Sequence, residues 1–170
     1  MTAERTLPVA ATALTATVAV CITFVAFGNI TDFGTNQEFV RHVLAMDTTF
    51  QDDDLMWRAV TDRTVQDAAY VLIIVWETLA ALVLLAATAL WVRGMGRTGP
   101  GYGPARRATT WGLLMLMLLF GLGFMAIGGE WFAMWQSAKW NGLQAAVRNF
   151  TFAGFVLVLI HLPSPQWSRD

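Results

Sequence analysis

Two charged residues interrupt stretches that are otherwise apolar, and they are the first candidates for chemistry. Glu77 lies in the apolar run 68–92 and Arg148 in the run 143–162. A charge near the bilayer centre costs roughly 2.5–3.5 kcal/mol, so such a residue faces other helices with a partner, is neutral, or takes part in function. A helix rises about 1.5 Å per residue along its axis. Glu77 is therefore ~15 Å deeper in the membrane than Asp67, and Arg148 is ~10 Å deeper than Asn141. We expect a Glu77–Arg148 ion pair that fixes helix packing. The alternative is that Glu77 binds a proton or cation during transport.

Glu38 and His42 are the candidate metal ligands. Their i, i+4 spacing places both side chains on one helix face. A metal ion would need further ligands there, for which Asp32, Asp47 or Glu130 are available. The alternative is a hydrogen-bonded or ion-paired surface, with Glu38 engaged at the helix start.

A wider set of polar residues falls in or beside the two longest polar connections. If these connections meet, the set could line a pocket for a ligand or substrate. His161 is expected at the opposite membrane face from His42, so a haem held by both histidines is not predicted, nor is any other cofactor. The set comprises Asn29, Asp32, Asn36, His42, Asp47, Glu130 and Asn141.

The composition places these residues in a membrane protein. The 170 residues are 56% hydrophobic and 14% charged, whereas soluble domains are about 25% charged. The net charge of -1 and the single lysine, Lys139, argue against a nucleic-acid partner. Cys21 is the only cysteine, so no disulfide or thiol pair is expected.

Four apolar runs are each about as long as the ~20 residues that cross a bilayer. We predict an all-α, single-domain, four-helix transmembrane bundle, with residues 9–27 as an anchor rather than a cleaved signal peptide. The predicted spans are 9–27, 68–92, 108–127 and 143–162; the outer connections are 28–67 and 128–142, and the inner one is 93–107.

Charge sets the predicted orientation. The connection 93–107 has four arginines and no acidic residue, so the positive-inside rule makes it cytoplasmic. Residues 28–67 hold eight acidic residues and three arginines, a net charge of -5. Both termini are therefore expected in the cytoplasm, and both longer connections outside, where we expect them to fold together as one lid.

The first outer connection contains a predicted amphipathic helix at 36–46. Thr35 and Glu38 form a Thr-x-x-Glu capping box, which predicts a helix start at Asn36. At 100° per residue, an apolar face opposes a polar one. The apolar face is Phe39, Val40, Val43, Leu44 and Met46; the opposite face is Glu38, Arg41, His42 and Ala45.

The second outer connection begins where Gly128 and Gly129 are expected to end the third helix. Trp131, Trp135 and Trp140 follow. Tryptophan is favoured at the membrane interface, where its ring lies in the apolar region and its N–H can donate to water.

Three groups of motifs resemble a bacterial family known only as predicted small integral membrane proteins of unknown function. The resemblance covers nearly the whole chain. It implies a four-helix protein of the bacterial cytoplasmic membrane and brings no assigned activity, substrate or cofactor. The motifs are Gly28-Asn29-Ile30-Thr31-Asp32; Asn36-x-x-Phe39-Val40-x-His42-Val43-Leu44-x-Met46-Asp47-Thr48; and Ala126-Ile127-Gly128-Gly129-Glu130-Trp131-Phe132-x-Met134-Trp135-Gln136-Ser137 with Trp140-Asn141-Gly142.

Three functions fit these residues. The favoured hypothesis is a noncatalytic accessory or structural subunit of a larger membrane complex, with the lipid bilayer and other membrane subunits, or further copies of itself, as partners. The second is a small proton- or cation-coupled transporter that uses Glu77. The third is an outer-face ligand- or metal-binding protein or enzyme.

Overall fold

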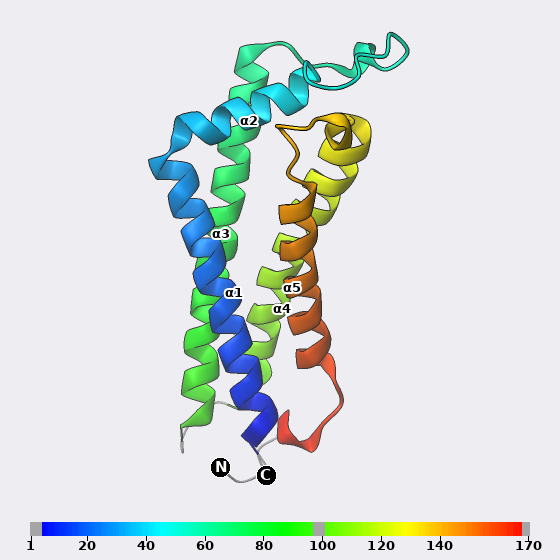
Figure 1. The fold of residues 1–170 in the computed structure, drawn as a ribbon. Coiled ribbons are helices and arrows are strands. Elements are labelled where there is room, and N and C mark those ends of the chain that lie inside the picture. The colour runs from blue at the N-terminus through cyan, green and yellow to red at the C-terminus, as the bar shows by residue number, and fades with distance from the viewer. Residues whose placement is uncertain (1–4, 97–100, 168–170) are drawn as a thin grey trace.

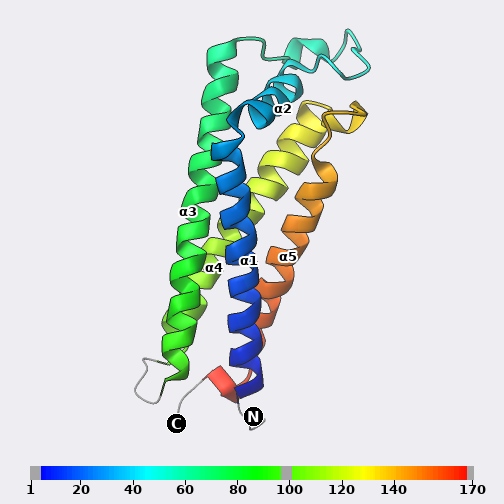
Figure 2. The same cartoon turned by 60° about the vertical axis from the view of Figure 1, so that its left-hand side comes forward.

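Four long helices form an all-α bundle, crossed at one end by a fifth. The computed structural model describes residues 5–96 and 101–167. In Figure 1, α1 (Thr6–Thr31) and α3 (Arg63–Met95) lie together, and α4 (Gly103–Met117) lies beside α5 (Leu143–His161). The pairs diverge toward the end where α2 (Phe33–Ala45) crosses, as Figure 2 also shows.

The predicted architecture is confirmed. The structure has four helices long and apolar enough to cross a membrane, and α2 lies between the first and second of them. The third predicted span, 108–127, falls on α4 and its continuation η3 (Leu118–Trp131), a segment of wider π-helical turns. Part of the predicted inner connection, residues 97–100, lies outside the described residues.

Two predicted helix boundaries are wrong. Helix α2 begins at Phe33 rather than Asn36, and there is no capping box: the Thr35 hydroxyl donates to Asp32, while Glu38 binds Arg41. The third helix also continues through Gly128 and Gly129 to Trp131. Leu143 packs against Gly129, where a Cβ would lie 2.8 Å from Leu143 Cδ2, so this glycine permits close packing with α5.

Small residues bring the helices of the bundle core together. Gly112 of α4 is a clear case, because a Cβ there would lie 2.6 Å from Leu84 of α3, whose side chain is fully buried. Such close backbone approach is how membrane helices gain packing contacts in lipid. At the end of the bundle away from α2, the Trp91 ring lies between the tilted rings of Tyr102 and Trp167. Its indole N–H donates to the Thr109 hydroxyl.

Short 3-10 turns lie between the helices and after α5. They are η2 (Met56–Arg58), η4 (Met134–Gln136) and η5 (Pro165–Trp167). Leu7 donates its backbone N–H to the Gln166 side chain at 2.9 Å, so the first and last described segments meet at the end of the bundle away from α2.

Candidate functional site

The segment between α1 and α3, which contains α2, and the segment between η3 and α5 form one cap, which we call the lid (residues 32–62 and 132–142). The Thr48 hydroxyl bonds Ser137 at 2.9 Å, and the Phe50 backbone N–H donates to Gln136 at 2.9 Å. Met46 is buried with Phe132 and Ala133 in a small core of the lid's own. The two connections therefore fold together, and α2 and the last turns of η3 lie at the same end of the bundle (Figure 1).

A charged clasp holds α2 to α3. Arg41 reaches Asp67 with two hydrogen bonds of 2.9 and 3.0 Å and also binds Glu38 at 2.7 Å. Gln37 donates to the same Asp67 carboxylate. The bonds to Asp67, and then those to Glu38, raise the pKa of the Arg41 guanidinium. Because Arg41 keeps its charge at any physiological pH, the clasp does not switch off through this residue.

The buried carboxylate of Glu77 binds an amide. Asn29, in the last turn of α1, donates to Glu77 at 2.6 Å, and the Tyr70 hydroxyl donates to the Asn29 backbone carbonyl at 2.9 Å. Glu77 is only 2% exposed. A polar network thus joins α1 to α3 directly beneath α2.

Arg148 does not take part in that network. Its side chain is exposed on α5, and no ion pair within 4.0 Å joins it to Glu77 among the described residues. The sequence predicts similar depths for Glu77 and Arg148, but it does not specify toward which neighbour each side chain points. Five residues beyond the start of α5, Arg148 can extend its long side chain toward the polar interface.

His42 lies on the lid between the Asp47 carboxylate and the Trp140 ring. Its Nδ1 is 2.8 Å from Asp47, its Nε2 is 3.9 Å from Glu38, and its ring stacks on Trp140 at 4.7 Å. Residues 5–96 and 101–167 contain no group of three or more His, Cys, Asp or Glu side chains placed to hold a metal. These contacts are those of a hydrogen-bonded, stacked side chain.

The other polar candidates are divided among separate contacts. Asn29 faces inward to Glu77, Asp32 accepts from Thr35, and Asn141 accepts from the Leu143 backbone. Glu130 lies exposed near the end of η3. The structure therefore pairs only His42 and Asp47 directly.

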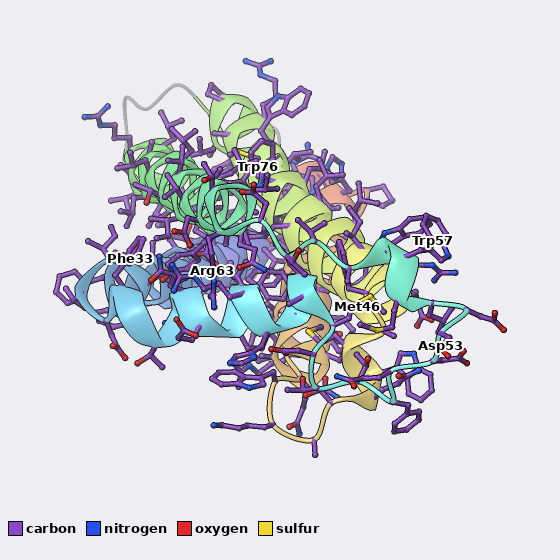
Figure 3. All side chains as sticks on the ribbon, turned by 90° about the horizontal axis from the view of Figure 1, so that it is seen from above. Phe33, Met46, Asp53, Trp57, Arg63 and Trp76 are labelled. Atoms are coloured by element: carbon purple, nitrogen blue, oxygen red, sulfur yellow. The ribbon has the colours of Figure 1, made fainter. Side chains whose placement is uncertain are left out.

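Four exposed aromatic rings form what we call the aromatic platform: Phe50, Trp57, Trp131 and Trp135. Trp57 meets Trp131 edge to face at 5.6 Å, and Phe50 meets Trp135 in the same way at 5.9 Å. The Arg58 guanidinium lies 4.9 Å from the Trp131 ring centre and 5.5 Å from that of Trp57. Seen from above in Figure 3, Asp53 and Trp57 project beyond the bundle, on the far side of Met46 from α2.

An apolar groove of about 500 Å³ opens between α3 and η3 beneath α2. Sequence reasoning missed it, because it arises where the two helix pairs diverge. The amphipathic pattern of α2 was the available signal, since four of the five predicted apolar residues form the groove's roof. The lining is Phe39, Val40, Val43 and Leu44 from α2; Ala69, Leu72, Ile73 and Trp76 from α3; Leu118, Leu119, Leu122, Gly123, Phe124, Ile127 and Gly128 from η3; and Phe132 and Met134.

The chain belongs to the family described as predicted small integral membrane protein (DUF2165), whose model matches residues 7–163. This confirms the resemblance seen in the motifs, and it makes the protein an integral membrane protein that contacts the lipid bilayer. No curated protein and no solved structure matches the chain.

Proposed function

We propose that this member of the family is a noncatalytic accessory subunit that docks onto a larger membrane complex through its aromatic platform. The observation that carries the proposal is the pre-organisation of exposed rings: Phe50 is 72% and Trp57 70% exposed, yet each is held by a ring partner. Tryptophan and arginine are the residues that most often dominate binding at protein interfaces. Rings already fixed in place lose little entropy on docking.

The place of the platform supports a protein partner beside the bundle. Trp57 extends sideways beyond the bundle (Figure 3), so a neighbouring membrane protein can reach the platform. Arg58 adds a cation between two rings, with its Nε buried and without a hydrogen-bond partner. This positive charge favours a partner that presents a carboxylate beside the rings.

The test is a gentle purification of the full-length protein from its native membrane. We expect partner polypeptides in fixed ratio, and their loss in Phe50→Ala and Trp57→Ala. Phe155→Ala and Trp111→Ala are matched controls, because these residues are similarly exposed, at 71% and 67%, on the spans away from the lid. A wild-type chain recovered alone, or equal recovery of partners from all four variants, would contradict the proposal.

We infer the orientation from charge. Arg93, Arg106 and Arg107 lie at the end opposite the lid, and the acidic residues gather in the lid. The positive-inside rule then puts the lid on the extracytoplasmic side and both termini in the cytoplasm of a bacterium.

A second candidate, proton- or cation-coupled transport, is favoured by the environment of Glu77. A buried carboxylate whose hydrogen-bond partner is a neutral amide is not committed to an ion pair. Glu77→Gln should then abolish a pH-dependent flux in vesicles while the protein still folds. Unchanged flux would exclude this role, and loss of folding would assign Glu77 to packing.

A further inference from the structure

The groove opens toward lipid. Its two walls are the spans α3 and η3, and residues at its edges are well exposed: Leu72 at 64%, Leu122 at 55% and Leu118 at 52%. Helix α2 closes it above, and Phe132 and Met134 of the lid continue the roof. An occupant must therefore enter from the side, out of the hydrocarbon region of the bilayer.

The lining offers nothing to a polar occupant. Trp76 has the one side-chain N–H among the lining residues, and its indole already donates to the Met115 carbonyl at 2.9 Å. A bound water needs two to four polar partners, which this lining does not provide. A polar group of a ligand would lose its hydrogen bonds to water there and gain none, so the lining favours a hydrocarbon ligand.

The groove is small compared with a whole helix. A helix about 10 Å across fills roughly 80 Å³ per ångström of its length, so a groove of this volume would hold only about one turn. Small ligands occupy pockets of roughly 300–1,000 Å³, a range that includes this one. A flexible chain can lie fully within such a groove, whereas a transmembrane helix could place only one face against it.

We propose that the groove binds one acyl chain of a membrane phospholipid, held under α2 between α3 and η3. The chain comes from hydrocarbon surroundings, so its binding rests on dense contact with fixed side chains rather than on the removal of apolar surface from water. The site is separate from the aromatic platform, and it would hold apart the two helix pairs that diverge there. The lipid then becomes part of the support for the lid.

Gly123→Leu tests the proposal by filling the groove. A Cβ at Gly123 would be no closer than 3.8 Å to Leu119, so the added side chain meets open space in the groove rather than a clash. Gly154→Leu is the matched control, since a Cβ there has similar room, 3.9 Å from Met117, on α5 outside the groove. Ala69→Leu fills the groove from the α3 wall as a second variant.

The measurement is native mass spectrometry of the delipidated full-length chain after addition of dioleoyl phosphatidylcholine. We expect one tightly bound lipid per wild-type chain, at least tenfold weaker binding in Gly123→Leu and Ala69→Leu, and no change in Gly154→Leu. Thermal unfolding in detergent checks that each variant is folded. Absence of a bound lipid from the wild type, or equal binding in all variants, would overturn the proposal.

A fluorescence measurement tests the proposal without the groove-filling variants. In nanodiscs of phosphatidylcholine brominated along its acyl chains, the Trp76 signal, taken as wild type minus Trp76→Phe, should be strongly quenched. An unquenched Trp76 would overturn the proposal. So would a wild-type dimer that Gly123→Leu dissociates, since the groove would then belong to a second copy.

Discussion

The bond between Asn29 and Glu77 is a polar contact between α1 and α3 at a buried carboxyl group. Removing one partner of a buried hydrogen bond leaves the other partner unsatisfied, which costs about 1–3 kcal/mol. We expect Asn29→Ala to lower stability by about this amount, measured as thermal or denaturant unfolding in detergent.

The control for this contact is Glu77→Gln, whose amide oxygen can still accept from Asn29 and which should be milder. A double-mutant cycle of Asn29→Ala and Glu77→Ala should give a coupling energy of about 0.5–3 kcal/mol, as for residues in direct contact. Additive effects of the two substitutions would show that the contact does not contribute.

At the scale of elements, α2 depends on its clasp to α3. Arg41→Lys keeps the charge but loses the two parallel bonds to Asp67. Since both partners are partly exposed, we expect a loss of only about 0.2–1 kcal/mol. The expected result is faster hydrogen exchange in residues 33–45, with little change in the global unfolding midpoint.

Arg63→Lys is the control for the clasp, because Arg63 is an exposed arginine in the first turn of α3. Its exchange pattern should match that of the wild type. Unchanged exchange of α2 in Arg41→Lys would mean that the apolar face of α2, rather than the clasp, holds the lid.

The packing of α3 on α4 depends on Gly112. A Cβ at this position would overlap Leu84, which is fully buried and cannot move aside freely. We expect Gly112→Ala to destabilise by about 1–3 kcal/mol, as overpacking does. Gly28→Ala is the comparison, since a Cβ there meets nothing within 4 Å in α1, and we expect stabilisation by about 0.4–1 kcal/mol. Equal unfolding midpoints for the two variants would contradict this account.

At the scale of the whole molecule, orientation in the membrane can be measured at the two ends of the bundle. In a Cys21→Ala background, Asp53→Cys places a thiol on the lid and Gly103→Cys places one at the opposite end; both positions are exposed. A membrane-impermeant maleimide applied to intact cells should label the first and leave the second unlabelled until the cells are opened. The reverse labelling pattern would show that the lid lies on the cytoplasmic side.

The sequence by itself determined the number and order of the spans, because a run of about 20 apolar residues has few alternatives to crossing a bilayer. It also placed a helix within residues 36–46, since the apolar face of α2 has a helical period. That period was sufficient to identify most of the residues that roof the groove.

Tertiary structure alone decided which polar groups meet. Glu77 and Arg148 lie at comparable distances along their spans, yet Glu77 faces α1 and Arg148 is exposed, because the rotation of each helix is set by packing with its neighbours. The start of α2 likewise depends on a contact from outside it, because Phe33 packs on Tyr70 of α3. Within α2, Glu38 binds Arg41 rather than closing a capping box. Local patterns specify which segments form helices, whereas partners far apart in the chain specify what each side chain does.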